Sequence, residues 1–340
     1  MGYSVAVVGA TGNVGREMLG ILAERSFPAD EIVALASRRS QGVDVSYGER
    51  TLKVKALEHY DFSGTDICLM SAGAAVSKEY SPKIAAAGAV VIDNSSAWRY
   101  DSDVPLIVPE VNADHVKLVH AQRWRQDSGG FVVTNPNCSA IGLVMALAPL
   151  QRGFGLEKVM VVTMQAVSGA GYPGVASLDI LGNVIPYIAK EEEKMEEETR
   201  KLLGHGEAAR IRPADFAMSA HCNRVAVEDG HTESVSVKLK RPARAEEIIE
   251  AFRSFRSLPQ ELRLPNAPEQ PLIYDCAPDH PQPRFDVDRG AGMSVSVGRL
   301  RPCGVLDWKF TVLSHNTIRG AAGAALLNAE LLKAQGYLGD

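Results

Sequence analysis

The sequence of 340 residues has no long apolar run, no closely spaced cysteines and no excess of positive charge. Its longest apolar run, residues 140–150, contains Pro149 and is far shorter than the roughly 20 residues that cross a bilayer as a helix. The formal net charge of −5 gives no overall attraction to nucleic acid or to an anionic membrane. The first residues enter a strand-like run without the basic segment of a secretory signal. We therefore expect a cytoplasmic protein with no nucleic-acid or membrane partner.

The five cysteines are an odd number, and even the closest pair, Cys276 and Cys303, is widely spaced. This spacing argues against a disulfide framework and against metal sites of the Cys-x-x-Cys type. No group of His, Cys, Asp and Glu has the spacing of metal ligands either, so we predict no metal.

A chain of this length is expected to form two domains, because domains run at roughly 100–200 residues. In the first part, short apolar runs alternate with helix-like segments such as residues 81–87. This pattern predicts an α/β fold with a Rossmann-like, doubly wound parallel sheet. The strands are expected at residues 4–8, 32–36, 67–70, 90–93 and 131–134.

The pattern changes beyond residue 150, where longer alternating segments predict an α+β arrangement with a mostly antiparallel sheet. Its strands are expected at residues 158–167, 232–239, 293–299 and 308–313, and its helices at residues 188–203 and 245–255. The proline-rich residues 258–289 are expected to be loop. A last helix of small residues, 316–332, is expected to pack back on the first domain.

A glycine-rich turn at residues 9–15, Gly-Ala-Thr-Gly-Asn-Val-Gly, follows the first strand and precedes a helix-like segment. Such glycines allow the backbone to approach a pyrophosphate that rests at the helix N-terminus, although an ordinary strand-to-helix turn is the alternative. The next strand ends in Ser-Arg-Arg-Ser at residues 37–40. These donors suit the 2′-phosphate of NADP, unless the arginines are merely solvated. We predict NADP as the cofactor.

Cys138 lies between a strand and an apolar helix, in Asn-Pro-Asn-Cys-Ser at residues 135–139. The free amides and the dipole at a helix N-terminus stabilise a thiolate, which predicts a thiol pKa below the ordinary value of about 8.5. The same amides can form an oxyanion pocket for an acyl group. Cys68, in an apolar strand, has instead the surroundings of an inert thiol. We therefore predict that Cys138 is an acyl-accepting nucleophile.

Six motifs resemble those of the aspartate-β-semialdehyde dehydrogenases and occur in the order found in that family. They lie at residues 9–15, 94–99, 135–139, 165–171, 224–231 and 315–323. Asp-Gly-His-Thr-Glu-Ser at residues 229–234, and the segment that begins at His315, resemble the archaeal and fungal branch more than the enterobacterial one. Six motifs in order are far more specific than any one of them.

The resemblance implies an NADP-dependent, phosphorylating dehydrogenase. Such an enzyme reduces L-aspartyl-4-phosphate to L-aspartate 4-semialdehyde in lysine, threonine and methionine biosynthesis. Cys138 would hold the acyl group as a thioester that accepts hydride from NADPH. His231 corresponds to the catalytic histidine, which relays a proton near its ordinary pKa of about 6.5. Gln165 corresponds to the glutamine that orients the substrate.

The resemblance also implies the substrate-binding residues. Arg224 would bind the α-carboxylate through a bidentate pair. Arg99 and Asn137 would bind and position the phosphate. Glu191 and Lys194 would reach the ammonium and the phosphate, although the charged run around them also has the composition of a solvated helix face.

For the cofactor, the resemblance implies contacts from Gly9, Thr11, Gly12, Asn13, Val14, Ser37, Arg38, Ser71, Gly73, Ser168, Gly169 and Asn316. It further implies a homodimer or homotetramer joined through the sheet of the second domain. On this basis, residues 1–137 and 315–340 form the NADP-binding domain, and residues 138–314 form the catalytic and dimerisation domain.

Three alternatives to this function match the residues present less well. An acyl-CoA reductase of the same fold, acting on malonyl- or succinyl-CoA, needs neither a carboxylate clamp such as Arg224 nor an ammonium partner. N-acetylglutamyl-phosphate reductase has a His-Pro-Gly-Cys motif at the nucleophile, which differs from the motif here. A non-catalytic NADP-binding paralogue is expected to lose Cys138 or His231, and both are present. The sequence therefore favours the aspartyl-phosphate reaction.

Overall fold

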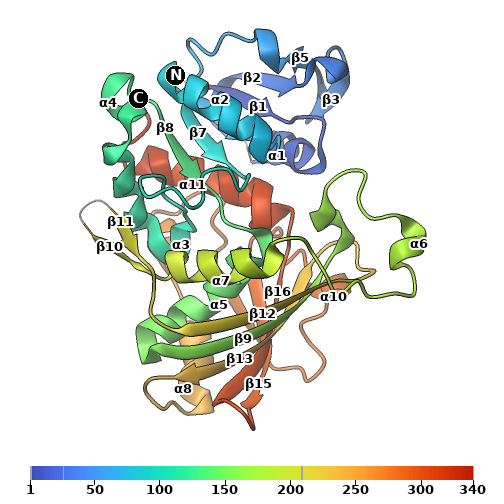
Figure 1. The fold of residues 1–340 in the computed structure, drawn as a ribbon, viewed down its shortest axis with the longest axis vertical. Coiled ribbons are helices and arrows are strands. Elements are labelled where there is room, and N and C mark those ends of the chain that lie inside the picture. Colours follow the sequence, from blue (N-terminus) through green and yellow to red (C-terminus); the bar gives the residue numbers. More distant parts are fainter. Residues whose placement is uncertain (1, 26, 208–209, 340) are drawn as a thin grey trace.

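The computed structural model describes residues 2–25, 27–207 and 210–339, which form two six-stranded sheets arranged along the long axis of the molecule (Figure 1). The first sheet is parallel throughout, in the order β5-β2-β1-β6-β7-β8. The predicted parallel sheet is therefore confirmed. Its strands are β1 (Tyr3–Val8), β2 (Ala29–Ala36), β5 (Lys55–Ala56), β6 (Ile67–Met70), β7 (Val90–Asp93) and β8 (Phe131–Thr134).

Helices cover both faces of this sheet because its strands are apolar on both sides. Val7 of β1 packs with α1 (Asn13–Glu24) and α11 (Gly323–Ala334), whereas the next residue, Val8, belongs to the core that includes α2 (Ala74–Ala86). The last helix thus returns to the first sheet, as predicted. The strand order reverses between β1 and β6, and such a reversal opens a crevice at the carboxyl ends of the two strands.

The second sheet is mixed, in the order β12-β9-β13-β16-β15-β14. Its three inner pairs are antiparallel and its two outer pairs are parallel, so the predicted mostly antiparallel sheet is confirmed. One face shares an apolar core with α5 (Cys138–Phe154), α7 (Glu191–Leu202) and α8 (Ala245–Arg253). The strands are β9 (Leu156–Gln165), β12 (Ala217–Arg224), β13 (His231–Leu239), β14 (Leu272–Asp275), β15 (Val295–Pro302) and β16 (Trp308–Ser314).

Some elements differ from the sequence prediction. Strand β12 was not predicted, and the region 258–289, predicted as loop, contains β14 and two short helices, α9 (Leu258–Glu261) and α10 (Pro283–Asp286). The last helix is predicted as regular from residue 316, but its first turn, Ile318–Ala322, is a π-helix. Turns of this kind often occur at functional sites, and this one passes beside the nucleophile.

No helix among the described residues is both long enough and apolar enough to cross a membrane.

The smaller elements lie around these two sheets. The smaller elements are the hairpin β3 (Asp44–Tyr47) and β4 (Arg50–Lys53), the pair β10 (His205–Glu207) and β11 (Arg210–Arg212), and the helices α3 (Pro109–Asn112), α4 (Arg123–Asp127) and α6 (Ser177–Ile180).

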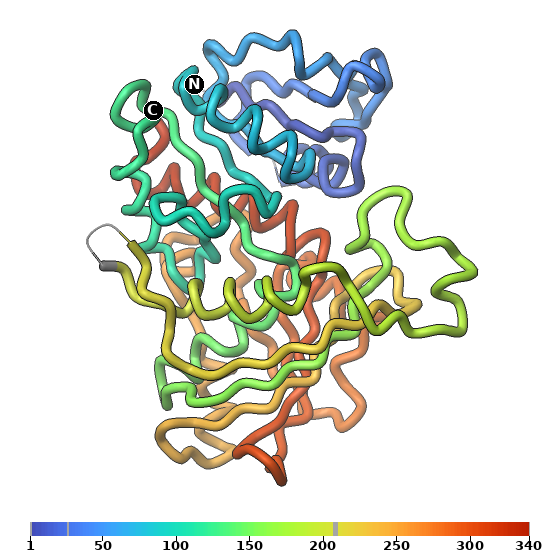
Figure 2. The backbone as a smooth tube through the Cα atoms, viewed as in Figure 1, coloured from blue at the N-terminus to red at the C-terminus, as the bar shows by residue number. Residues whose placement is uncertain are grey.

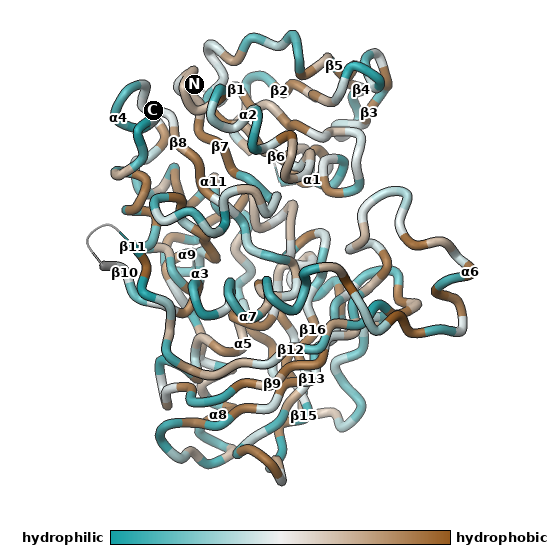
Figure 3. Tube along the Cα trace, in the orientation of Figure 1, coloured by the Kyte–Doolittle hydropathy of each residue, from teal (hydrophilic) through white to brown (hydrophobic). Residues whose placement is uncertain are grey.

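Two features of the second half bear on function. Helix α7 lies between the two sheets and is mostly hydrophilic (Figures 1 and 3). The segment 171–189, with α6 near its tip, projects from the body of the molecule beside the mixed sheet (Figure 2). Tyr172, Leu178 and Tyr187 on this segment are exposed apolar side chains.

Candidate active site

The mixed sheet brings four polar side chains into one row at the end of its strands. The register pairs Arg224 on β12 with Gln165 on β9, and His231 on β13 with Ser314 on β16. Continued by one residue, the register between β9 and β13 also makes Gln165 and His231 neighbours. The row therefore crosses four strands, and its side chains share the buried face of the sheet.

Cys138 faces this row from the first turn of α5. Asn137 caps the helix, because its side-chain oxygen accepts hydrogen bonds from the amides of Ser139 and Ala140 at 2.9 and 3.1 Å. The sulfur lies 3.2 Å from Nε2 of His231. The structure thus places Cys138 at a helix N-terminus, as predicted, and brings it against the histidine that the motifs single out.

His231 is fully buried, and the amide of Ala166 donates a hydrogen bond to its Nδ1 at 3.1 Å. In the neutral ring the proton is therefore on Nε2, which faces the sulfur. Burial, followed by the positive charges of Arg224 and His315, lowers the pKa of His231 to about 3. The expected ordinary pKa is thus wrong for the free protein, because the ring is desolvated and lies near a guanidinium. His231 is a neutral hydrogen-bond donor toward the sulfur.

The thiol of Cys138 is less acidic than predicted. Burial, followed by the negative charge of Glu191, raises the pKa of Cys138 to about 12. Arg99, Arg224 and the amide of Ser139 act in the opposite direction but offset only part of this rise. The prediction of a lowered pKa is therefore wrong for the free protein, because desolvation of a thiolate outweighs the helix N-terminus.

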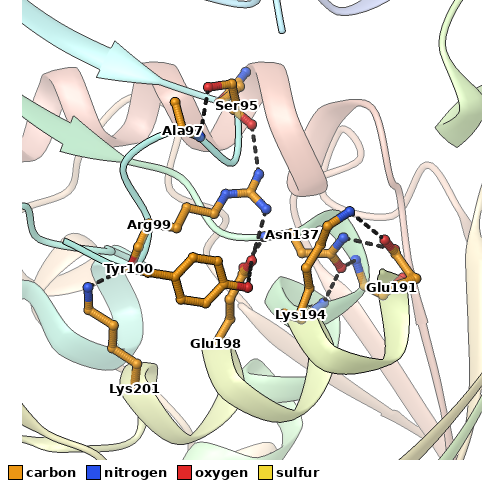
Figure 4. Close-up of polar contacts among 12 residues, drawn as sticks. Ser95, Ala97, Arg99, Tyr100, Asn137, Glu191, Lys194, Glu198 and Lys201 are labelled. Carbon is orange, nitrogen blue, oxygen red and sulfur yellow. Dashed lines mark hydrogen bonds and ion pairs between the residues drawn. The ribbon is translucent and has the colours of Figure 1, made fainter. Parts of the chain in front are cut away.

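Glu191, the first residue of α7, gathers three of the predicted residues beside the nucleophile (Figure 4). Its carboxylate accepts hydrogen bonds from Nδ2 of Asn137 at 2.8 Å and from Nε2 of Gln165 at 3.1 Å. Nζ of Lys194 lies 3.2 Å from the other oxygen. The predicted pair of Glu191 and Lys194 therefore points into the site, and the solvated alternative is wrong for this face of α7.

Arg99 also lines this site, and two partners hold its guanidinium. Its Nη1 is 3.0 Å from Oε1 of Glu198, and its Nη2 donates to the carbonyl of Asn94 at 2.7 Å. Glu198 is fully buried and was not predicted as a site residue. Helical spacing could have identified Glu198 from the sequence, because positions 191, 194 and 198 lie on one face of a helix.

Arg224 is only 6% exposed and donates through Nη1 to the carbonyl of Ala166 at 2.7 Å. The turn after β9, Val167–Ala170, packs closely over it. A Cβ at position 169 would lie 3.0 Å from Nη1 of Arg224 and 2.9 Å from Cε1 of His231. Gly169 therefore packs against these two side chains, in addition to the cofactor contact that the resemblance implies.

A single pocket of about 550 Å³ joins the predicted substrate and cofactor residues. Gln165 and His231 lie behind its wall, in contact with Glu191 and Cys138 respectively. Gly320, on the π-helical turn, also lines the pocket, and a Cβ there would lie 2.7 Å from Cβ of Cys138. The predicted residues in the wall are Val14, Ser71, Gly73, Arg99, Asn137, Cys138, Ser168, Gly169, Glu191, Lys194, Arg224 and Asn316.

The glycine-rich turn has the backbone that a dinucleotide pyrophosphate requires. Gly9 has a φ of 87°, and a Cβ there would collide with the backbone of Ser71. A Cβ at Gly15 would collide with the backbone of Gly9. Thr11, Gly12 and Asn13 complete the turn before the N-terminus of α1, so these residues fit a pyrophosphate at the helix start.

The two ends of the cofactor site also fit NADP. Ser37 and Arg38 follow the carboxyl end of β2 and are exposed, with Arg39 beside them, which suits a 2′-phosphate. Asn316 donates through Nδ2 to Oγ of Ser168 at 2.8 Å and accepts the amide of Gly230 at 2.8 Å. Ser168 and Asn316 thus form a fixed wall where the pocket approaches Cys138.

Glu233 is a buried acid on β13, two residues after His231 and on the same face of the sheet. It is fully buried, and neither of its carboxylate oxygens has a hydrogen-bond partner among the described residues. Burial, followed by the charge of Glu191, raises the pKa of Glu233 well above its ordinary value. The surroundings therefore favour the protonated form of this side chain.

One further cluster lies outside this pocket and has no motif in the sequence. Asp275, His280 and Asp286 place ligand-type atoms within 4.8 Å of one another. Arg289 lies 2.8 Å from Asp275 and 2.6 Å from Asp286, so its guanidinium balances both carboxylates. Among the described residues, this cluster therefore forms an ion-pair network.

Comparison with known proteins defines the class of this fold and site. The model of the semialdehyde dehydrogenase NAD-binding domain matches residues 4–119, and that of the semialdehyde dehydrogenase dimerisation domain matches residues 147–319. The glycine-rich turn lies in the first match, and the Gln165, Arg224 and His231 row lies in the second. The fold and the site are those of a semialdehyde dehydrogenase.

Individual relatives specify the family. The aspartate-semialdehyde dehydrogenase of Archaeoglobus fulgidus is 46% identical over 345 residues and aligns with 98% of each chain. That of Schizosaccharomyces pombe is 39% identical over 354 residues, which cover 98% of this chain and 99% of the relative. The crystal structure of aspartate semialdehyde dehydrogenase with NADP from Candida albicans matches with a TM-score of 0.88 and 37% identity, over 99% of this chain and 100% of that one. The chain belongs to the aspartate-semialdehyde dehydrogenase family, and the resemblance to archaeal and fungal members is confirmed.

Proposed function

We propose that the chain catalyses the NADPH-dependent reductive dephosphorylation of L-aspartyl-4-phosphate to L-aspartate 4-semialdehyde, a step toward lysine, threonine and methionine. The observation that carries this proposal is one pocket in which Cys138 lies with Arg99 and Arg224. An acyl phosphate that also has an α-carboxylate is anionic at both ends, which matches two guanidinium groups that share one pocket with a nucleophile.

In the first step, the sulfur of Cys138 attacks the acyl carbon. The carbon–sulfur bond forms as the carbon–oxygen bond to phosphate breaks, and the thiol proton leaves on the phosphate as HPO₄²⁻. Arg99 and Lys194 stabilise the charge on the departing phosphate, while Arg224 holds the α-carboxylate. Glu191 receives the substrate ammonium.

NADPH, when bound, would supply the hydride that reduces the thioester carbon. The glycine-rich turn would hold its pyrophosphate, Ser37 and Arg38 its 2′-phosphate, and Ser168 and Asn316 its nicotinamide end. Nε2–H of His231 donates a hydrogen bond to the charge that develops on the acyl oxygen and then on the sulfur as the carbon–sulfur bond breaks. A neutral ring with its proton fixed on Nε2 is suited to this donation. The released thiolate then takes a proton that comes from water, which restores the thiol.

The proposal is tested in the reverse direction with the purified chain, L-aspartate semialdehyde, NADP and phosphate. Reduction of NADP that requires phosphate is the expected result. A parallel reaction with CoA in place of phosphate separates the acyl-CoA reductase alternative, which would be active with CoA alone. Absence of activity with both acceptors would favour a non-catalytic paralogue and contradict the proposal.

We also infer how the chain is organised and assembled. Residues 1–137 with 315–340 would form the NADP-binding domain and residues 138–314 the catalytic and dimerisation domain, which the two separate sheets support. The exposed Met160 and Val162 on β9, together with the apolar segment 171–189, support a homodimer or homotetramer built on this sheet. Light scattering after size exclusion distinguishes these states from a monomer.

The same proposal places the enzyme in the cytoplasm. All five cysteines are free thiols, including the exposed Cys276. Unpaired cysteines are typical of a reducing compartment. Fractionation of cells that produce the chain at natural levels would test this location.

A further inference from the structure

We propose that Glu198 is a positioning residue that couples Arg99, which binds the phosphate, to residues 135–137, which lead into the nucleophile Cys138. This inference rests on the proposed function, in which Arg99 binds the phosphate of the substrate. It concerns a side chain that no sequence motif singled out.

Glu198 is buried in the middle of the site and contacts three donors (Figure 4). Its Oε1 lies 3.0 Å from Nη1 of Arg99 and accepts a longer hydrogen bond from the hydroxyl of Tyr100 at 3.5 Å. Its Oε2 accepts a hydrogen bond from the backbone amide of Asn137 at 2.6 Å. One carboxylate therefore bridges Arg99 and the residue that directly precedes Cys138.

The charge of Glu198 is needed because both partners of the ion pair are buried. The side chain of Arg99 is 7% exposed and that of Glu198 is 0% exposed. A buried carboxylate or guanidinium is tolerated only when it is paired. The carbonyl of Asn94 accepts from the other terminal nitrogen of Arg99, so the guanidinium is held in one orientation. Its Nε has no partner among the described residues, and Arg99 lines the pocket. Donors of Arg99 thus remain for phosphate oxygens.

Asn137 is held by α7 through two carboxylates. Glu198 binds its backbone amide, and Glu191 accepts from its side-chain nitrogen at 2.8 Å. The side-chain oxygen of Asn137 meanwhile caps α5, on which Cys138 is the first residue. The position of the sulfur along its approach to the acyl carbon therefore depends on the register of α7.

Lys201 extends the same helix contact to the loop that carries Arg99. Its Nζ donates to the carbonyls of Arg99 at 2.6 Å, Asp101 at 3.1 Å and Val104 at 3.4 Å. The backbone around Arg99 is thus fixed by Lys201, and the guanidinium is fixed by Glu198. Helix α7 therefore sets the separation between the phosphate site and the sulfur.

Loss of the Glu198 carboxylate should act on phosphate rather than on the other ligands. An amide at this position has an NH₂ group that cannot accept from Arg99 while its oxygen accepts from Asn137. The guanidinium then loses its orientation, whereas Arg224 is held separately by Ala166 and the cofactor turn lies on the other sheet.

The test compares Glu198→Gln with Glu197→Gln, an identical charge change at the exposed neighbouring position on α7. Kinetic constants are measured in the phosphate-dependent reduction of NADP. Glu198→Gln should raise the KM for phosphate by about tenfold or more and lower kcat, with the KM for NADP within about twofold of wild type. Glu197→Gln should match wild type. Equal KM values for phosphate in the two variants would overturn the proposal.

A double-mutant cycle tests whether Glu198 acts through Arg99. Arg99→Gln and the double variant Arg99→Gln/Glu198→Gln are compared, and the double variant leaves no unpaired buried charge. If the two residues form one unit, Glu198→Gln should weaken phosphate binding no further in the Arg99→Gln background. Calorimetric titration with inorganic phosphate gives this comparison even where turnover is low. Additive losses would overturn the coupling.

The controls separate the possible failures. If Glu198→Gln does not fold, as judged by circular dichroism, Arg99→Gln is compared with the double variant, and weaker phosphate binding by the double variant would overturn the coupling. A wild-type chain without phosphate-dependent activity would contradict the proposed function and this inference with it. An active wild type with an unaffected Glu198→Gln variant would contradict this inference alone.

Discussion

Substitution of Gly169 by alanine should impair catalysis while leaving the fold intact. The added Cβ would lie 2.9 Å from Cε1 and 3.1 Å from Nε2 of His231, and 3.0 Å from Nη1 of Arg224. These distances are shorter than normal carbon contacts, so a neighbour must move. Gly169 has no left-handed φ and is exposed, so the alanine itself is free of backbone strain. The substitution is therefore a steric probe of the histidine and the arginine.

The magnitude follows from how His231 is held. The ring is fully buried, bonded to the amide of Ala166 and 3.2 Å from the sulfur of Cys138, so a shift of a few tenths of an ångström disturbs one of these contacts. A misplacement of about 1 Å can cost about 100-fold in rate, so we expect kcat to fall roughly tenfold. This corresponds to about 1.4 kcal/mol of transition-state stabilisation. The free energy of unfolding should fall by about 1–3 kcal/mol, because the added methyl group overpacks two buried side chains, and the fold should remain intact.

The assay is steady-state reduction of NADP with L-aspartate semialdehyde and phosphate, together with urea unfolding. Gly153→Ala is the matched control, because a Cβ there meets no atom within 4 Å and the residue has no left-handed φ. This control should keep the wild-type kcat and gain up to about 1 kcal/mol of stability from its helical position. A Gly169→Ala variant with wild-type kcat would show that the packing of Gly169 against His231 has no part in catalysis.

Three further substitutions test separate parts of the site. Arg224→Lys should raise the KM for L-aspartate semialdehyde about tenfold or more without changing the KM for phosphate, because lysine cannot form a bidentate pair with a carboxylate. Equal effects on both KM values would refute the role assigned to Arg224. Arg38→Glu should raise the KM for NADP about tenfold or more but not that for NAD, and an unchanged ratio of the two would place the 2′-phosphate elsewhere. Burial and the charge of Glu191 raise the pKa of Glu233, so the stability that its proton provides is present below the ordinary value of 4.5 and is lost as pH rises through the folded-state pKa. Urea unfolding of Glu233→Gln should therefore show a gain over wild type that grows by up to about 1.4 kcal/mol per pH unit as the pH rises above 4.5 toward the folded-state pKa. A pH-independent difference would refute the raised pKa.

Much of the first sheet could be predicted from the sequence because its signals are local. Strands β1, β6, β7 and β8 are short apolar runs buried on both faces, and the glycine-rich turn marks the first crossover. Strand β14 is an edge strand within a proline-rich stretch, and it pairs only with β15. Its strand conformation depends on that distant partner. The π-helical turn likewise depends on a long-range contact, the approach of Gly320 to Cys138.

The site could be predicted where a motif marks a residue, and could not where burial decides its state. Cys138, Arg224 and His231 follow from their motifs, and the structure brings all three to one place. Glu198 lies in a run of acidic residues whose composition indicates solvent, and only the phase of α7 turns it inward. The pKa values of Cys138 and His231 were predicted from local features, namely a helix start and an ordinary imidazole. Desolvation by segments distant in the sequence raises the pKa of Cys138, where the helix start predicts a lower one, and lowers the pKa of His231.

A burst experiment without phosphate tests whether Cys138 carries the acyl group. The chain is mixed with NADP and L-aspartate semialdehyde, NADPH is followed in the first turnover, and the protein is then digested for mass spectrometry. We expect about one NADPH per chain, an aspartyl adduct on Cys138, and resumed turnover when phosphate is added. The Cys138→Ala variant should give neither burst nor adduct. A burst that persists in Cys138→Ala, or phosphate-dependent turnover in that variant, would contradict the account.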